Sequence, residues 1–564
     1  MVCRIAPKPD GSTNAGSPQE SPEIADYETT LDAAGYGRFS RSVLVASACS
    51  FFTTGVQNCV MSYVLPAARC ELQLTTYQAG LINMAFMSGG VASAFFWGIV
   101  GDVFGRKNVL SMTLLVDSTL LLAQSTVTDY RLLLAARSIN GFLIGAPSTL
   151  VFTYLSDLVG AKKRQIYLDI TGMSFVAAWL ILPAIAWLVI PFNVNSQPTL
   201  WPIYSWRLYI AICSIPGFLA GIWLTFLPES PRLLSDTNRG EEALKIMNYI
   251  NKSNNGLDAE FKIKKIIQDS IFVSKSVKGE ENRTKALFVS VLKDLKMFVS
   301  KAYAVKSSLI LFIFFANMAA GFGLNLWIPE LLLRMQGKDC KSTSLEYKVV
   351  NTSHASWKDL PKRIDYGSQE RYNYTIEVRG EHCDGNIDHS VFTSGLIVGA
   401  CCVLGNAACA LISSRGDGRG VRRAAAACTL ACALACVCLA ACVCACSSSR
   451  VAVAAAAALN AASLNGNVLL IRLLLHALPA KLSGLGVCWG AWWGRAGGVA
   501  SNLAVGVLLD YSCPAPFVSV GALLALSIGG IMMLKLDESG AEDEDKTEDS
   551  DKNLGLDRYI STHM

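Results

Sequence analysis

Apolar runs of about twenty residues recur along this 564-residue chain, separated by short polar stretches. A helix of about this length crosses a hydrocarbon layer of about 30 Å, whereas a membrane β-barrel shows short segments of alternating polarity. Only 16% of the residues are charged, against about a quarter in soluble domains. The pattern predicts an all-α polytopic membrane protein. We expect twelve transmembrane helices, at residues 43–65, 77–100, 108–127, 131–155, 167–191, 204–226, 306–330, 390–413, 423–446, 451–478, 484–509 and 514–535.

Basic residues are concentrated in alternate loops, and this distribution sets the predicted orientation. Arg106 and Lys107 follow the second span, three basic residues at 162–164 follow the fourth, and four arginines at 415–423 follow the eighth. Loops rich in Lys and Arg remain in the cytoplasm, so an even number of spans places both termini there. The net charge of +5 is small and gives no indication of a nucleic-acid partner.

The loop between the seventh and eighth spans is predicted to lie on the opposite, lumenal side. It contains two glycosylation sequons, which begin at Asn351 and Asn373, and such sequons are modified only where they are exposed to the lumen. Cys340 and Cys383 lie in the same loop and could form a disulfide. Cys70 and Cys513 are competing outer partners, so the pairing stays open.

A short cluster of Gly, Asp, Arg and Lys separates two apolar segments in the stretch "WGIVGDVFGRKNVL", residues 97–110. The preference for positive charge on the inside explains Arg106 and Lys107, but not the glycines or Asp102. Asp102, at the end of the second span, could face the N-terminal dipole or a guanidinium of a neighbouring helix. Such a contact would form in one arrangement of the helices and break in another, which makes this hinge a candidate latch.

This hinge resembles the loop 2–3 signature of the major facilitator superfamily. "RSINGFLIG" at 137–145 resembles the pattern of the fourth helix in that family, and "LPESPRLL" at 227–234 carries a PESPR motif typical of sugar-porter-like members. The segments "LDAAGYGRFSR", "VFTYLSDL" and "LNLWIPELL" are similar to the synaptic vesicle glycoprotein 2 and related-protein group. The short lumenal loop, about 337–389, resembles that of invertebrate-type members, because the vertebrate glycoproteins have a longer, repeat-bearing domain there.

The resemblance implies the major facilitator fold, in which two pseudo-symmetric six-helix bundles surround a central cavity and alternate its access to the two sides of the membrane. The predicted organisation is a cytoplasmic tail at 1–42, a bundle at 43–226, a cytoplasmic loop with amphipathic helices at 227–305, a second bundle at 306–535 that includes the lumenal loop, and an acidic cytoplasmic tail at 536–564.

The resemblance also implies a charged network that closes the cytoplasmic side. Its predicted members are Asp102, Arg106, Asp157, Arg164, Glu229 and Arg232. The corresponding hinge of the second half, "LISSRGDGRGVRR", has Ser414 where the acidic residue belongs, although Asp417 could replace it after a shift. We therefore expect the second latch to be weaker than the first.

Ionisable residues inside spans are costly and usually face a cavity or a partner. Arg495 lies roughly 16 Å into the eleventh span, too deep for easy contact with water. Asp117 is either a proton site or the partner of Arg137, and both readings stay open. The other predicted cavity residues are polar and uncharged: Thr54, Gln57, Asn140 and Asn325. The deep charge is positive in sum, which favours an anionic or zwitterionic solute.

Two functions remain open at this stage. The first is a secondary-active transporter for a small organic ion, and the second is a non-transporting vesicle glycoprotein that regulates trafficking or exocytosis through partners bound to its tails. The location implied is a vesicle membrane or the plasma membrane, in contact with lipid. The chain shows no phosphate-binding loop, metal-ligand pair or nucleophile constellation, so we expect no enzymatic activity, no metal and no cofactor.

Overall fold

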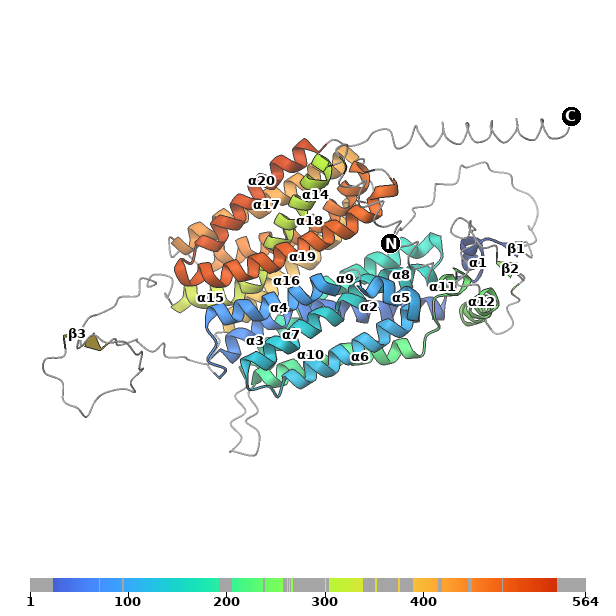
Figure 1. Ribbon diagram of the computed structural model, residues 1–564, viewed down its shortest axis with the longest axis horizontal. Coiled ribbons are helices and arrows are strands. Elements are labelled where there is room, and N and C mark those ends of the chain that lie inside the picture. The colour runs from blue at the N-terminus through green and yellow to red at the C-terminus, as the bar shows by residue number, and fades with distance from the viewer. Residues whose placement is uncertain are drawn as a thin grey trace.

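The computed structural model contains two bundles of long helices that lie side by side, one from each half of the chain (Figure 1). We call the end with the hinges at 104–106 and 159–161 the inner end and the opposite end the outer end, after the predicted orientation. The structure describes residues 24–69, 71–93, 96–191, 205–236, 239–256, 261, 263, 265–266, 300, 304–337, 350–351, 374–375, 389–413, 418–444, 449–478 and 480–534.

The N-terminal bundle is built from helices that begin and end near the predicted span limits. Several spans are broken into two helices, as where α2 and α3 meet around Val60. The elements are α2 (Arg38–Cys59), α3 (Met61–Ala68), α4 (Thr76–Ser93), α5 (Phe96–Phe104), α6 (Arg106–Gln124), α7 (Tyr130–Leu143), α8 (Gly145–Leu158), α9 (Ala161–Val189) and α10 (Ser205–Thr225).

The C-terminal bundle follows the same up-and-down course. Its first span passes through an irregular π-helical and 3₁₀ segment, which gives the helix backbone unusual freedom at that depth. The elements are α14 (Ala304–Met318), η1 (Ala319–Leu324), η2 (Asn325–Trp327), α15 (Ile328–Gly337), α16 (His389–Ser413), α17 (Gly418–Cys444), α18 (Ser449–Ala477), α19 (Ala480–Tyr511) and α20 (Ala515–Met533).

A helix lies at each of the twelve predicted spans. Among the described residues, nine stretches are long and apolar enough to cross a membrane, or ten if α4 and α5, bent by 52°, form one span. The remaining two predicted spans, 108–127 and 484–509, coincide with α6 and α19. The outward faces of the bundles carry large apolar side chains such as Leu219 and Leu526, as a lipid-facing surface requires.

Small elements cover the two ends of the bundles. At the inner end lie α1 (Tyr27–Ala33), α11 (Pro231–Asp236), α12 (Gly240–Asn255) and the parallel pair β1 (Ile24–Ala25) and β2 (Lys265–Ile266). The helix α12 covers part of the predicted amphipathic segment and buries Met247 and Ile250. Beyond the outer end, β3 (Val350–Asn351) pairs antiparallel with β4 (Tyr374–Thr375).

The two bundles touch most closely toward the outer end. A Cβ placed on Gly80 of α4 would lie 3.2 Å from the backbone oxygen of Asn502 in α19, and one on Gly399 of α16 would lie 2.3 Å from the backbone oxygen of Trp179 in α9. Glycine lets the backbones of facing membrane helices approach this closely. The indole Nε1 of Trp187 also donates to Nδ1 of His389 across the two halves, at 2.9 Å.

Candidate functional site

A charged network at the inner end joins several elements of the N-terminal half. The buried carboxylate of Asp157, at the end of α8, accepts hydrogen bonds at Oδ2 from Nη1 of Arg106 and Oγ of Ser230, both at 2.5 Å. Arg106 also donates to Oδ1 of Asp102, from Nη2 at 3.0 Å and from Nε at 3.2 Å. We call Asp102, Arg106, Asp157, Glu229 and Ser230 the inner network. Ser230 was not among the predicted gate residues.

Glu229 occupies the N-terminus of α6, a place that the sequence analysis offered to Asp102. Its Oε1 accepts from the backbone N–H of Lys107 at 2.9 Å, where the helix dipole favours a negative charge. Gly105, with φ at +97°, turns the chain into α6, and a Cβ there would lie 2.4 Å from Oε2 of Glu229. Asp102 instead pairs with Arg106 and leaves 51% of its side chain exposed.

Arg164 and Arg232 contact the N-terminal helix α1 through one carboxylate. Glu28 lies 2.6 Å from Nη2 of Arg164 and 3.7 Å from Nη1 of Arg232. The hydroxyl of Tyr27 donates to the backbone oxygen of Asp157 at 2.6 Å. Burial raises the pKa of Tyr27 well above its usual value, and the Asp157 carboxylate adds to that effect, so the hydroxyl remains a donor. The sequence analysis missed Tyr27 and Glu28, which lie outside any motif.

A buried polar network lies at the centre of the N-terminal bundle. The Asp117 carboxylate accepts from Nε2 of Gln57 and from Nδ2 of Asn140, each at 2.6 Å. Arg137 donates from Nη1 to Oε1 of Gln57 at 2.7 Å and from Nη2 to its backbone oxygen at 2.9 Å. The Gln57 amide therefore bridges Asp117 and Arg137. These four side chains, at most 1% exposed, tie α2, α6 and α7 together.

Thr54 lies apart from that network. Its hydroxyl donates to the backbone oxygen of Ser50 one turn earlier in the same helix, at 3.3 Å. Such a local bond satisfies the hydroxyl within the helix. The structure therefore brings Gln57, Asp117, Arg137 and Asn140 together and leaves Thr54 outside the group.

The centre of the C-terminal bundle is held by amides rather than by charges. Asn325 follows the π-helical turn, and its Nδ2 donates to the backbone oxygen of Gly321 at 3.0 Å, to Oδ1 of Asn460 at 3.1 Å and to Oγ of Ser463 at 3.3 Å. Eight residues earlier, Nδ2 of Asn317 donates to the backbone oxygen of Ser463 at 3.1 Å. Asparagine and serine bonds of this kind connect helices within a membrane.

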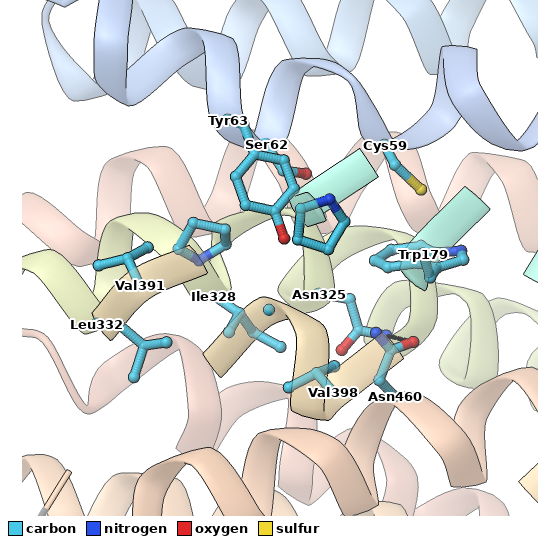
Figure 2. Close-up of a pocket in the computed structure, with 13 residues that line it drawn as sticks. Cys59, Ser62, Tyr63, Trp179, Asn325, Ile328, Leu332, Val391, Val398 and Asn460 are labelled. Carbon is cyan, nitrogen blue, oxygen red and sulfur yellow. Dashed lines mark hydrogen bonds between the residues drawn. The ribbon is translucent and has the colours of Figure 1, made fainter. Parts of the chain in front are cut away.

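A small cavity of about 20 Å³ lies between the two halves, beside this amide network. Figure 2 shows Asn325 and Asn460 hydrogen-bonded to one another near Trp179, with Ser62 and Tyr63 on the opposite helix. Its volume suits a water molecule rather than a solute. The lining residues are Cys59, Ser62, Tyr63, Trp179, Pro183, Asn325, Ile328, Pro329, Leu332, Val391, Gly395, Val398 and Asn460.

Several polar atoms at this cavity are buried without a partner. Among the described residues, none donates to Oδ1 of Asn325 or accepts from Nδ2 of Asn460. Oγ of Ser62 and Nε1 of Trp179 are in the same state. A buried polar atom without a hydrogen bond is unfavourable. These atoms, which come from both halves, can therefore bind a polar ligand placed between the halves.

Arg495 connects the two halves near the middle of α19. Its Nη1 donates to the backbone oxygen of Gly90 in α4 at 2.8 Å, and its Nη2 donates to Oγ of Ser148 in α8 at 2.9 Å. Within the described part of the chain, no carboxylate forms an ion pair with this guanidinium. Arg495 is therefore a deep positive charge held by neutral acceptors of the opposite half.

The predicted features of the outer loop lie largely outside the described residues. This holds for Asn373, Cys340 and Cys383, while Asn351 has its backbone in β3. The second hinge at 414–417, predicted on the inner side, also lies outside the described residues. Cys513 is disulfide-bonded, and its partner also lies outside the described residues. Glycosylation and the Cys340–Cys383 bond therefore stay predictions.

These observations define a multi-pass membrane protein with two packed helical halves and polar groups enclosed between them, the architecture of a transporter. The sequence model of the Major Facilitator Superfamily matches residues 43–345, more than half of the chain. The chain belongs to this family. The family is typically non-enzymatic, which agrees with the expectation that the protein is not an enzyme.

Distant relatives are found among the synaptic vesicle glycoproteins 2. The human synaptic vesicle glycoprotein 2B is 28% identical over 331 residues, which is 56% of this chain and 48% of the relative. The rat synaptic vesicle glycoprotein 2A is 26% identical over 381 residues, 64% of this chain and 51% of the relative. The chain thus spans about half the length of the curated relatives it matches.

Solved structures agree on the fold. The crystal structure of a D-xylose-proton symporter superposes with a TM-score of 0.60 at 13% identity, covering 89% of this chain and 99% of that one. A partially occluded inward open form of the xylose transporter XylE from E. coli gives a TM-score of 0.59 at 13% identity, covering 87% and 98%. At this identity the likeness shows the major facilitator fold alone.

Proposed function

We propose that the chain is a secondary-active transporter that moves a small organic anion or zwitterion by alternating access. The observation that carries this proposal is Arg495, whose guanidinium extends from the C-terminal half to Gly90 and Ser148 of the N-terminal half. A charge at this depth is costly unless it faces a partner or a solute. Neutral oxygens hold it in place without neutralising it, so it can attract an anionic group.

The other buried charged residues also favour a solute with an anionic group. Arg137 and Asp117 are both bound to Gln57, so their opposite charges nearly cancel within one group. Arg495 is then the unbalanced charge between the halves. Asn325 and Asn460 supply an acceptor and a donor for the uncharged part of a solute.

The test is transport by the full chain in proteoliposomes, with labelled organic anions and cations offered separately. We expect Arg495→Gln to reduce anion flux by at least about tenfold, because the loss of a charge-assisted contact has roughly that effect. Arg495→Lys should retain part of the flux. Arg450→Gln, which removes an exposed arginine from the same half, is the matched control. Undiminished anion flux in a folded Arg495→Gln variant would contradict the proposal.

The second candidate is a non-transporting vesicle glycoprotein that regulates trafficking through its tails. The observation that favours it is the attachment of α1, at the end of the N-terminal tail, to Arg164 and Asp157. The relatives named above are vesicle glycoproteins by name. Deletion of 536–564, compared with Arg495→Gln, separates the two functions in a secretory cell. Vesicle sorting lost only in the deletion supports regulation, whereas solute uptake lost only in Arg495→Gln supports transport.

A further inference from the structure

We propose that Arg69, Glu330 and Arg334 form an outer latch, a charge cluster that holds the outer ends of the two halves together and must break for the outward-open state. The inference rests on the proposed alternating-access function and adds to it the residues that control one of its two gates. None of the three residues belongs to the motifs at the inner end.

Glu330 is the centre of the cluster. Its Oε1 accepts from Nη1 of Arg69 at 2.8 Å and from Nε of Arg334 at 3.0 Å. Arg69 follows α3 in the N-terminal half, whereas Glu330 and Arg334 lie in α15 of the C-terminal half. The Glu330 side chain is 13% exposed, so the pair is partly screened from water and is stronger than a fully exposed one.

Arg334 extends the cluster to two further helices. Its Nη2 donates to Oγ of Thr76, the first residue of α4, at 2.7 Å, so it also crosses between the halves. Its Nη1 donates to the backbone oxygen of Leu509 at 3.3 Å. Its Nη2 lies 3.6 Å from Oδ1 of Asp510. A guanidinium near the C-terminus of α19 is also favoured by the helix dipole.

The cluster borders a second small cavity between the halves. Arg69, Thr76 and Glu330 line this cavity of about 20 Å³, and Ser62 lines it as well. Ser62 also lines the first cavity, where Asn325 and Asn460 meet. The outer latch therefore lies beside a cavity that neighbours the central polar groups.

The described ion pairs of the inner network do not connect the two halves. These pairs, Arg106 with Asp102 and Arg106 with Asp157, both lie within the N-terminal half. The ion pair that joins the two halves in the described part of the chain, Arg69 with Glu330, lies at the outer end. Removing the Glu330 charge should therefore weaken the outer-closed state more than the outward-open state.

The test is hydrogen–deuterium exchange with mass spectrometry on the full chain in lipid nanodiscs. We expect Glu330→Gln to raise the outward-open population by roughly five- to tenfold. Deuterium uptake should rise in peptides from 61–79 and 326–334 at the outer end. It should fall in peptides from 150–158 and 418–428 at the inner end, because the inner side closes when the outer side opens.

Glu71→Gln is the matched control. Glu71 forms an ion pair of 2.6 Å with Arg207 at the same end, with 18% of its side chain exposed, but both partners belong to the N-terminal half. This control should show no fall at the inner end. Arg69→Gln serves as a second latch variant and should reproduce the effect of Glu330→Gln.

Two results would overturn the latch. One is a rise in uptake at the outer end without a fall at the inner end, which indicates local loosening only. The other is the same reciprocal change in Glu71→Gln. Because exchange is measured without a solute, an error in the proposed anion preference leaves this result unaffected, and failure of the latch leaves the Arg495 flux assay unaffected.

Discussion

The two halves of the molecule organise their polar cores with different chemistry. In the N-terminal half, buried carboxylates meet arginines directly, as with Asp157 and Arg106, or through an amide, as with Asp117 and Arg137. In the C-terminal half, Asn325 is bound to neutral amide, hydroxyl and backbone oxygens beside a π-helical turn. Charged networks resist rearrangement more than amide contacts do. The comparison indicates a stiff N-terminal half and a C-terminal half that adapts around the cavity.

The largest effect should follow from Asp157→Asn, which removes the carboxylate from the inner network. Arg106 would keep a partly buried guanidinium with only Asp102 as a charged partner, and the loss of one partner from a buried pair costs about 3–5 kcal/mol. Denaturant titration of the purified protein in detergent measures the change in the free energy of unfolding. Asp169→Asn, an exposed residue of α9, is the control and should be near neutral. If Asp157→Asn lowers the free energy of unfolding by less than about 1 kcal/mol, the inference of a stiff N-terminal half is wrong.

A smaller but more direct contrast comes from one substitution in each core. Asp117→Asn should reduce the free energy of unfolding by about 2 kcal/mol, since hydrogen bonds to a charged group contribute about 1.5–3 kcal/mol. Asn325→Ala should cost about 0.6 kcal/mol, the average for a hydrogen bond between membrane helices. The same denaturant titration compares the two variants. Equal losses would remove the distinction between charged and amide cores.

Four members of the inner network were named as gate residues from the sequence: Asp102, Arg106, Asp157 and Glu229. Asp102 and Arg106 are four residues apart on the two sides of Gly105, so the short hinge keeps them close. The sequence left Asp102 two possible partners, a helix N-terminus or a guanidinium. It pairs with the guanidinium of Arg106, while Glu229, from a distant part of the chain, occupies the N-terminus of α6. Local spacing carries no information on that arrangement.

Arg106 and Asp157, 51 residues apart, were predicted as members of one network, but two other contacts between distant residues were not predicted. Glu28 reaches Arg164, and Arg69 reaches Glu330, only because the bundles place distant segments side by side. Glu28 and Arg69 lie outside the motifs, and nothing in the local sequence links them to Arg164 or to Glu330. The fold class was predictable because apolar length is a property of each segment taken alone, whereas these contacts are properties of the assembled pair of halves.

The smallest effect is expected at α1, the helix of the N-terminal tail that contacts the N-terminal half. Glu28→Gln removes the carboxylate between Arg164 and Arg232, while Tyr27 keeps its bond to the Asp157 backbone, so we expect a loss of at most about 1 kcal/mol. Deuterium uptake of residues 26–37 should rise because α1 detaches more often. Glu242→Gln, from an exposed pair with Arg239, is the control and should leave that segment unchanged. Unchanged uptake in Glu28→Gln would mean that apolar packing against α12, rather than charge, holds the tail to the N-terminal half.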